Sequence, residues 1–176
     1  LMESKMQIRL YESWMRDQVI RLFGDQYKVS FDAFSKTFDA LYTDEIRMGN
    51  CVRVVSLDGD VVIGFQSYFY WPYMYKGKVF RAFQSGNSLV HPAHRGKGIF
   101  AKMLKYIDEE KESLGVDFLI GFPVAASYNS FIREGWKNPF DLRWYLKPLS
   151  LISVFRKVNL EKLRILFPLD SKGFNC

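Results

Sequence analysis

Apolar residues along the chain follow two periods, one typical of helices and one typical of strands. Residues 6–10 form a short run that predicts a first strand. Residues 12–24 and 31–47 carry their apolar side chains at helical spacing, so that each segment predicts an amphipathic helix. The first part of the chain is therefore expected to be a strand followed by two helices.

The middle of the chain changes to strand-like runs separated by turn residues. Residues 51–57 and 61–70 are rich in β-branched and aromatic residues, and an Asp-Gly turn lies between them. A third run, 79–91, follows a Lys-Gly-Lys turn at residues 76–78. These signals predict an antiparallel meander of three strands.

The rest of the chain alternates helices with strands. Residues 96–113 carry apolar side chains at helical spacing, with Ile99, Met103 and Ile107 four apart, and form the clearest helix candidate, with Gly115 at its C-cap. A buried-type strand, a short helix, a last strand and a basic amphipathic helix are expected at residues 116–122, 125–134, 142–147 and 150–167. The elements predict one α/β domain (α+β mixed sheet), a central twisted mixed sheet of about six or seven strands flanked by helices.

Composition narrows the class of protein. A chain of 176 residues suits one domain, and 48% hydrophobic residues supply a core. No stretch reaches the roughly 18 apolar residues of a membrane span, and charged residues near the N-terminus speak against a secretory signal. Cys51 and Cys176 give no disulfide framework, and no Cys or His spacing predicts a metal site. We expect a cytoplasmic protein without a membrane span or a metal.

The formal charge of +6 suits an anionic ligand without identifying it. A basic surface would favour the binding of nucleic acid, of an anionic membrane or of a small molecule with phosphate groups. Basic residues are scattered, except in the segment 156–164. Nucleic-acid binding would show a steep dependence on salt, and we expect no such partner.

The junction between strand and helix at residues 89–100 carries the clearest chemical signal. A proline stops the strand, and two glycines precede the long helix. The first amides of a helix have no partner within it, so Gly96 and Gly98 would let a diphosphate approach them closely, and Arg95 and Lys97 add positive charge. The pattern matches neither the Walker A loop nor the dinucleotide fingerprint. An ordinary tight turn into a helix is the alternative interpretation.

The run Val-x-Pro-x-x-Arg-Gly-x-Gly from Val90 to Gly98 resembles the central motif of the GNAT acetyltransferase superfamily. The segment Phe-Ile-Arg-Glu-Gly-Trp at residues 131–136 is similar to a second segment of the family, and the resemblance covers about residues 6–148. It implies a GNAT domain over residues 1–149. Such an enzyme moves an acetyl or other short acyl group from acyl-CoA, normally acetyl-CoA, to a primary amine and needs no metal.

The resemblance also assigns roles to residues around this junction. The turn that binds the pyrophosphate of coenzyme A would consist of Arg95, Gly96, Lys97, Gly98 and Ile99. The backbone of Leu89 and Val90 would pair with the pantetheine arm as an added strand does. The thioester would lie between two splayed parallel strands, 79–91 and 116–122, where an N–H near Val90 polarises its carbonyl group.

Two residues depart from the pattern of the family. Phe100 stands where the family usually has Gly or Ala, and Phe131 aligns with the tyrosine that usually protonates the departing thiolate. Because phenylalanine has no proton to donate, Tyr128 is the candidate general acid, and Ser127 could substitute for it. A packing role is the alternative for Tyr128. The missing tyrosine also leaves a catalytically weak acyl-CoA-binding module as an alternative function.

Candidates for a general base lie on the third strand of the meander. No Asp or Glu occurs between residues 79 and 94, which leaves Gln84, Ser88 and His91. Histidine titrates near neutral pH, although His91 at a strand end also fits a non-catalytic, exposed position. Ordered water and the proximity of the reactants are a further alternative.

Two patterns bear on the acceptor. The aromatic run at residues 68–75 would wall a pocket for a sugar ring or an apolar group, or else form ordinary cross-strand pairs. Gly-Phe-Pro at 121–123, Ser127-Tyr128 and Gly-Trp-Lys at 135–137 look like a subgroup encoded with bacterial surface-polysaccharide genes, which implies an amino-sugar acceptor. A protein N-terminal or lysine acetyltransferase is the alternative, and it should need an acidic peptide groove.

The segment that follows the domain, residues 150–176, is expected to be an extension. Its part 150–167 has the pattern of a basic amphipathic helix. We expect it to pack on the domain, to form a homodimer contact or to contact an anionic surface.

Overall fold

The computed structural model describes residues 6–43 and 50–141 of the chain. It contains two compact units, 1–137 and 138–176, and every helix and strand named below belongs to the first. In the second unit, the side-chain amide of Asn138 donates to a carboxylate oxygen of Asp141 at 3.0 Å. The predicted strand at 142–147 and the predicted helix at 150–167 lie outside the described residues.

The elements follow the predicted order. The strands are β1 (Met6–Leu10), β2 (Cys51–Asp58), β3 (Val61–Tyr75), β4 (Lys78–Val90) and β5 (Phe118–Ile120). The helices are α1 (Arg16–Tyr27), α2 (Phe31–Tyr42), α4 (Ile99–Glu110) and α5 (Ala125–Arg133), with short 3-10 turns at Ser13–Met15 and Pro92–His94.

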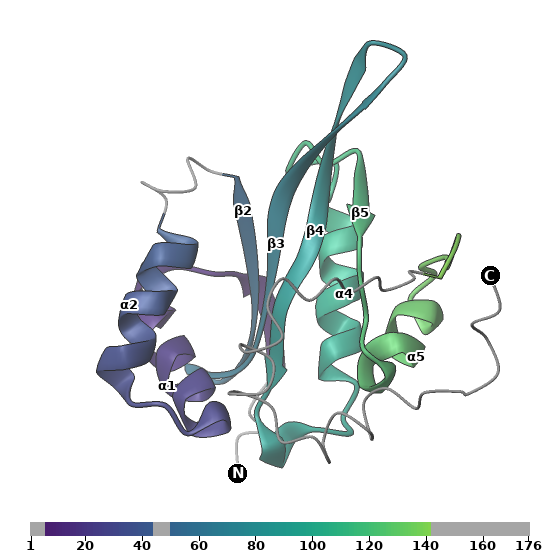
Figure 1. Cartoon of the computed structure of the whole chain (residues 1–176). Coiled ribbons are helices and arrows are strands. Elements are labelled where there is room, and N and C mark those ends of the chain that lie inside the picture. The colour runs from purple at the N-terminus through teal and green to yellow at the C-terminus, as the bar shows by residue number, and fades with distance from the viewer. Residues whose placement is uncertain (1–5, 44–49, 142–176) are drawn as a thin grey trace, which may run out of the picture. The chain divides into compact units, whose positions relative to one another are not determined.

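The strands form one mixed sheet in the order β1-β2-β3-β4-β5 (Figure 1). The pairs from β1 to β4 are antiparallel, and β5 is parallel to β4. This arrangement confirms the predicted α/β class with a mixed sheet flanked by helices. Within the described residues the sheet has five strands, fewer than the six or seven predicted for the whole chain, of which the strand at 142–147 lies outside these residues.

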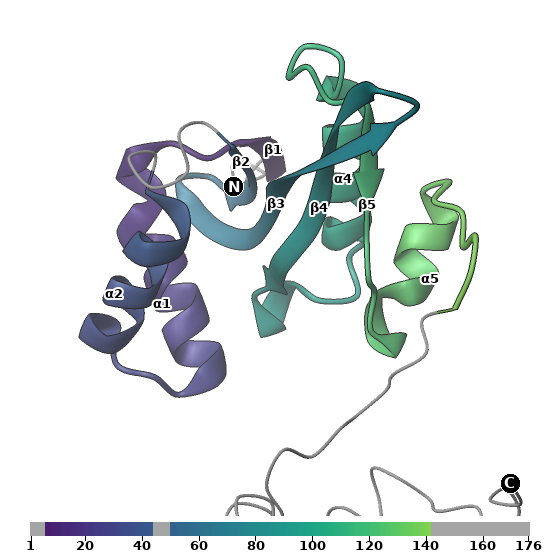
Figure 2. The ribbon, with the colours of Figure 1, turned by 45° about the horizontal axis from the view of Figure 1, so that its top comes forward.

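The two faces of the sheet are covered by different helices. The pair α1 and α2 lies on one face and α4 lies on the other, as two views of the ribbon show (Figures 1 and 2). On β2, Val55 belongs to the cluster that contains Phe38 of α2, whereas its neighbour Val54 belongs to the cluster that contains Met103 of α4. Successive residues of a strand point to opposite faces, and burying each such side chain stabilises the fold by about 1.5–3 kcal/mol.

Several element ends differ from their predicted positions. The first helix starts at Arg16 rather than at residue 12, because a 3-10 turn precedes it. The second helix ends at Tyr42 rather than at residue 47, because Thr43 has extended backbone angles. The third helix starts at Ile99 rather than at residue 96, because Gly98 is its left-handed N-cap.

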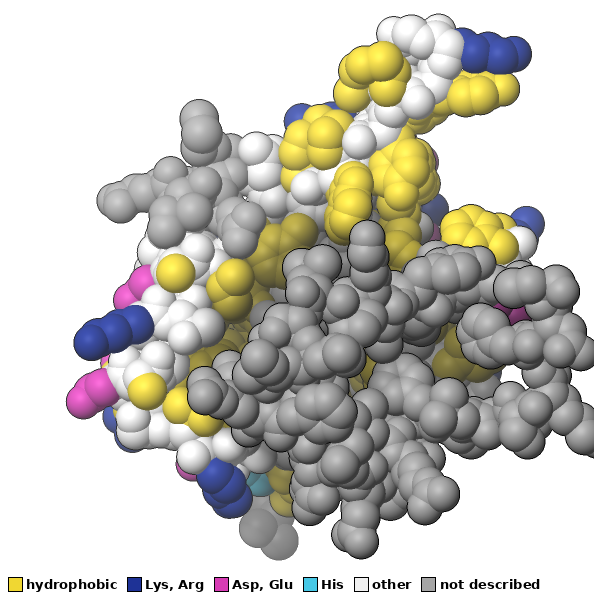
Figure 3. Space-filling model, in the orientation of Figure 1, with side chains coloured by type: hydrophobic (Ala, Val, Ile, Leu, Met, Phe, Trp, Pro, Cys, Tyr) yellow, Lys and Arg dark blue, Asp and Glu magenta, His cyan; other side chains and the backbone are white. Residues whose placement is uncertain are grey.

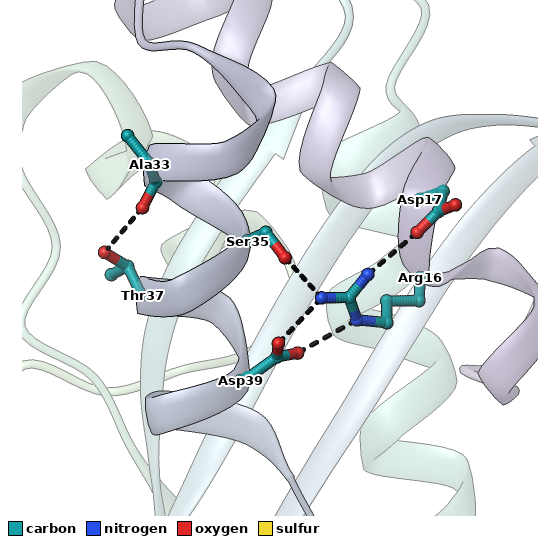
Figure 4. Close-up of polar contacts among 6 residues, drawn as sticks. All are labelled: Arg16, Asp17, Ala33, Ser35, Thr37 and Asp39. Atoms are coloured by element: carbon teal, nitrogen blue, oxygen red, sulfur yellow. Dashed lines mark hydrogen bonds and ion pairs between the residues drawn. The ribbon is translucent and has the colours of Figure 1, made fainter.

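An ion pair joins α1 to α2. Nε and Nη2 of Arg16 donate to the two carboxylate oxygens of Asp39, at 2.9 and 2.7 Å (Figure 4). The same guanidinium donates to the hydroxyl of Ser35 at 2.5 Å and to the carboxylate of Asp17 at 2.8 Å. The hydrogen bonds from Arg16 lower the pKa of the Asp39 carboxyl group.

Beyond Cys51, the first residue of β2, the strands β3 and β4 continue as a two-stranded hairpin that projects past the other strands (Figure 1). The strand β3 therefore ends at Tyr75, whereas the sequence pattern predicts its end at residue 70. Lys76 and Gly77 form the two-residue turn, with φ of 47° and 77°. Positive φ at both turn residues is typical of the type I′ turn, whose twist matches that of the strands.

Pro72 is compatible with this longer strand because of where its nitrogen points. The N–H of Arg81, which pairs with Pro72, donates to the carboxylate of Asp117 at 2.7 Å, and its C=O accepts from the Asp117 N–H at 3.0 Å. Both backbone groups of Arg81 thus face away from β3, so the Pro72–Arg81 pair is of the type without hydrogen bonds. The nitrogen of Pro72, which has no hydrogen, faces the open edge of β3.

Candidate functional site

The strand β4 contains a bulge close to the point at which it leaves β5. On β3, Gln66 pairs with Ser88 while Tyr68 pairs with Ser85, so β4 holds an extra residue between these two pairs. A bulge of this kind bends the strand and changes which backbone groups face each neighbour.

Side chains from β3 and α2 hold the bulge in place. A Cβ atom at Gly86 would lie 2.5 Å from the ring of Phe69, so this position accepts no side chain unless the ring moves. The amide of Asn87 donates to the hydroxyl of Tyr42 at 2.5 Å, and the hydroxyl of Ser67 donates to the carbonyl of Asn87 at 3.4 Å.

The bulge reverses the direction of the backbone groups along β4. Before it, the N–H and C=O of Arg81 face the side of β5. After it, the N–H of His91 donates to the carbonyl of Ile63 on β3 at 2.8 Å. Because the direction alternates from residue to residue, Ser88 and Val90 direct their N–H groups toward the side of β5. There β5 pairs only with residues 82–84, so a gap lies beside the end of β4.

A glycine turn connects this end of β4 to α4. Gly96 and Gly98 have φ of 78° and 71°, and Gly98 is the N-cap of α4 without a side-chain cap. A Cβ atom at either glycine would meet nothing within 4 Å, so the space beside the turn is open. The first amide of α4 that bonds back into the helix is that of Lys102, which donates to the carbonyl of Gly98 at 3.0 Å. The three amides before it are therefore directed out of the helix.

These elements enclose a cleft of about 500 Å³. Its walls are the end of β4, the glycine turn, the first turn of α4 and one side of α5. The residues of the walls are Ser88, Leu89, Val90, His94, Arg95, Gly96, Gly98, Ile99, Phe100, Ala101, Val124, Ala126, Ser127, Ser130 and Arg133.

The charge of the cleft is positive. Arg95 and Arg133 lie in its walls without an acidic neighbour among the wall residues. The sequence has no Asp or Glu at all between residues 61 and 107. Nε of Arg95 donates to the carbonyl of Val90 at 3.0 Å, and Nη2 donates to the side-chain carbonyl of Gln26 at 2.6 Å, so this guanidinium also fixes the turn against β4. An anion held by the turn is therefore favoured by charge as well as by the helix dipole.

Most of the predicted ligand-binding residues come together in these walls. Leu89, Val90, Arg95, Gly96, Gly98 and Ile99 all line the cleft. Lys97 is the exception among them, because its side chain is exposed and lies outside the walls.

The three predicted catalytic residues are placed differently from one another. Ser88 lines the cleft. His91 lies outside the walls, where its Nδ1 accepts from the Ala93 N–H at 3.3 Å and caps the 3-10 turn. Tyr128 is 38% exposed and also lies outside the walls, whereas its neighbour Ser127 lines them.

Three polar wall residues, His94, Ser130 and Arg133, are not identified by the sequence analysis. Ser130 and Arg133 follow Ser127 at intervals of three on α5, so a helical projection of that segment would have placed them on one face. His94 is part of the 3-10 turn before the glycines. No spacing rule singled it out.

The two residues that depart from the expected motif contact each other. The rings of Phe100 and Phe131 meet edge to face, with centroids 5.6 Å apart, and Phe131 meets Trp136 in the same way at 4.8 Å. Phe131 is only 5% exposed and lies against Gly121, where an added Cβ would come within 2.9 Å of its ring. Phe131 is thus a core residue, and Phe100 lies between it and the cleft.

The aromatic run divides into two parts. Tyr68 is completely buried, its hydroxyl has no hydrogen-bond partner, and burial raises its pKa. Tyr70 packs on Phe83. Residues 71–75 belong to the projecting hairpin, and no residue of the run lines the cleft.

Two other kinds of site, a membrane span and a metal centre, are not found in the part of the chain that the structure describes. Within residues 6–43 and 50–141, no helix is long and apolar enough to span a bilayer. The same residues contain no group of three His, Cys, Asp or Glu side chains placed to hold a metal ion.

Comparison with known proteins identifies the family. The profile of the acetyltransferase (GNAT) domain family matches residues 7–137. The chain therefore belongs to the GNAT acetyltransferase family. No curated protein matches it in sequence at a significant level.

Solved structures with the same fold have low sequence identity to this chain. The aminoglycoside N-acetyltransferase AAC(6')-Iy, in complex with a bisubstrate analogue of CoA, is 14% identical with a TM-score of 0.65 over 82% of this chain and 99% of its own. Glucosamine-6-phosphate N-acetyltransferase from Arabidopsis thaliana is 19% identical, with a TM-score of 0.60 over 81% of this chain and 99% of its own. Ribosomal-protein-alanine N-acetyltransferase from Brucella melitensis biovar Abortus 2308 is 17% identical, with a TM-score of 0.61 over 82% of this chain and 100% of its own.

Proposed function

We propose that the protein transfers an acetyl or another short acyl group from acyl-CoA to a primary amine of a small molecule, with an amino sugar as the acceptor class. One observation carries this proposal: the gap beside Val90 opens into the same cleft as the glycine turn. A cofactor with a diphosphate at one end and a thioester at the other matches both features. Acyl-CoA would supply the activated acyl group.

The residues of the cleft fit the diphosphate end of such a cofactor. The amides directed out of the first turn of α4 would donate to phosphate oxygens, and Gly96 and Gly98 leave room for close approach. Arg95 of the glycine turn and Arg133 of α5 would add positive charge. These features support the role that the sequence analysis expects for the glycine turn, with Arg133 as an addition.

The end of β4 fits the pantetheine arm and the thioester. Ser88 and Val90 direct their N–H groups into the gap, and the carbonyl of Val90 already accepts from Arg95. We assign to the Val90 N–H the donation of a hydrogen bond to the thioester carbonyl oxygen, where negative charge develops during transfer. Leu89 would contribute mainly through its side chain, because its backbone groups face β3.

The reaction needs one group that donates a proton to the departing thiolate and one that accepts a proton from the amine. Tyr128 and His91 stay candidates for these roles, but neither lines the cleft, so we favour two serines that do. Ser127 and Ser88 do line it, and their hydroxyl groups would relay protons between the reactants and water. Holding the amine close to the thioester would supply a large part of the rate by itself.

The acceptor class rests on sequence and on two names among the structural relatives. The segments at 121–128 and 135–137 resemble a subgroup associated with surface-polysaccharide genes. The relatives include an aminoglycoside and a glucosamine-6-phosphate acetyltransferase, and also a ribosomal-protein-alanine acetyltransferase. The absence of acidic residues between 61 and 107 argues against a groove for basic peptides.

Calorimetry with acetyl-CoA and a thiol-release assay over a panel of amines test the proposal. We expect micromolar binding and release of thiol with amino sugars. Binding without thiol release for any amine would indicate the acyl-CoA-binding module instead. Acetylation of peptide N-termini in preference to sugars would indicate a protein acetyltransferase. Absence of any affinity for acyl-CoA would refute the assignment of the cleft.

A further inference from the structure

The end of the β3–β4 hairpin carries apolar side chains that the proposed reaction does not use. We call residues 71–81 the hairpin tip. Figure 3 shows hydrophobic side chains along the projecting hairpin and basic ones at its end. Its largely exposed apolar residues are Trp71, Tyr73, Met74, Tyr75 and Val79. Next to the turn, Met74 and Tyr75 are 75% and 64% exposed.

The apolar side chains lie on both faces of the hairpin tip. Met74 pairs with Val79 on one face. On the other face Tyr73 pairs with Phe80, and both rings also contact Phe118 of β5, although Tyr73 stays 42% exposed. A protein partner that lies against a two-stranded hairpin covers one face of it. The interfacial region of a lipid bilayer, in contrast, surrounds both faces of an inserted tip.

The charge of the hairpin tip is entirely positive. Lys76 and Lys78 flank Gly77, Arg81 follows, and no acidic residue occurs in the strands β3 and β4. Nζ of Lys76 lies 5.3 Å from the centre of the Tyr75 ring. Lys76 has φ of 47°, a backbone conformation that Asn or Gly adopts more easily in this type of turn. A lysine thus occupies the end of the hairpin in spite of its unfavourable backbone.

We infer that the hairpin tip is a contact site for an anionic lipid bilayer. Met74, Tyr75 and Trp71 enter the headgroup region, where aromatic side chains are favoured, and Lys76 and Lys78 contact lipid phosphates. Each lysine near an anionic surface strengthens binding about fivefold. The contact is peripheral and reversible, and it does not depend on the chemistry proposed for the cleft.

Co-sedimentation of the full chain with vesicles tests this inference. One set of vesicles contains phosphatidylcholine alone, and the other contains about one third phosphatidylglycerol. We expect binding to the anionic vesicles, and a weaker or undetectable binding to the neutral ones. The double variant M74S/Y75S should bind the anionic vesicles about tenfold more weakly. The double variant K76N/K78Q should lose about 25-fold, because two lysines are removed.

Matched controls exist elsewhere in the chain. Val61→Ser changes an apolar residue that is 60% exposed at the other end of β3. Lys28→Asn repeats the Lys-to-Asn change at the second non-glycine residue with positive φ, 57°, among the described residues. Both controls should bind vesicles like the unchanged protein. The substitution at Lys76 should also leave the turn intact, because Asn-Gly is favoured in type I′ turns.

Three results would overturn the inference. The first is equal binding of the unchanged protein and both tip variants, which would place any lipid contact elsewhere, including residues 150–167. The second is a dimer in sedimentation velocity that M74S/Y75S dissociates in the absence of lipid, which would make the tip a self-association surface. The third is a lower melting temperature of M74S/Y75S without vesicles, which would show that the chain itself covers the tip.

Discussion

Phe100 and Phe131 lie edge to face, with ring centroids 5.6 Å apart, between the cleft and the core under α5. The family usually has a small residue at the first position and a tyrosine at the second. The two departures thus meet in one contact, in which Phe100 lines the cleft and Phe131 is buried. Because phenylalanine has no proton to donate, the proton for a departing thiolate would come from another group.

A double-mutant cycle measures the interaction free energy between the rings of Phe100 and Phe131. Phe131→Ala should lower the free energy of unfolding by about 3–5 kcal/mol, because the ring is nearly completely buried. Phe100→Ala should cost less, because this ring is half-buried. The double variant should be more stable, by about 0.5–1.5 kcal/mol, than the sum of the losses in the two single variants predicts. Chemical denaturation provides the values, and strict additivity would show that the rings do not act together.

Replacement of a cleft glycine should weaken acetyl-CoA binding. Gly98→Ala places a Cβ at a residue with φ of 71°, in the open space proposed for the diphosphate, so we expect about a tenfold higher Kd. Gly77→Ala is the matched control, because Gly77 has φ of 77° and equally open surroundings in the hairpin turn. Calorimetry should show unchanged affinity for this control. Equal losses in both variants would point to strain alone.

The proton donor can be tested on α5. Tyr128→Phe should change kcat by less than about threefold, because the ring lies outside the cleft walls, whereas Ser127→Ala should lower it about tenfold. Neither change should alter the Kd of acetyl-CoA by more than about threefold. Steady-state kinetics with the best acceptor gives kcat, and calorimetry gives the Kd of acetyl-CoA. A large loss of kcat in Tyr128→Phe alone would restore this tyrosine as the acid.

The ion pair between α1 and α2 makes the stability depend on pH. Hydrogen bonds from Arg16 lower the pKa of Asp39 below its ordinary value of 3.8. The stabilisation of the folded state by this ion pair is therefore complete above pH 3.8, the ordinary pKa. It is lost as the pH falls through the lower pKa that Asp39 has in the folded protein. Asp39→Asn should reduce the free energy of unfolding at neutral pH by about 0.5–1 kcal/mol, since the pair is partly exposed and screened. In denaturation curves at decreasing acidic pH, the two proteins should converge.

Most of the fold could be predicted from local patterns, since strand and helix periods depend on neighbouring residues. The end of β3 could not. Pro72 normally argues against a strand, and only the contacts of Arg81 with Asp117 show that its nitrogen faces an open edge. A sequence pattern contains no such information on the partner strand.

The geometry of the glycine turn is likewise more predictable from sequence than the positions of the catalytic candidates. Gly96 and Gly98 are neighbours in sequence and in the turn, so the motif itself describes the geometry. His91 and Tyr128 were chosen for their chemistry, and their positions relative to the cleft depend on the capping of a short turn and on the rotation of α5. Helical spacing groups Ser130 and Arg133 with Ser127, but which face of α5 meets the cleft depends on tertiary packing.

The gap beside Val90 also has a consequence for the lifetime of the protein. The strands β4 and β5 are joined by only three residue pairs, so the space between them is open over the last residues of β4. An acyl-CoA that fills this space would complement the sheet and slow amide hydrogen exchange at Ser88 and Val90. At a hundred times its Kd, a ligand that binds only the native state raises stability by about 2.7 kcal/mol. The supply of cofactor would then govern how long each molecule resists unfolding and proteolysis.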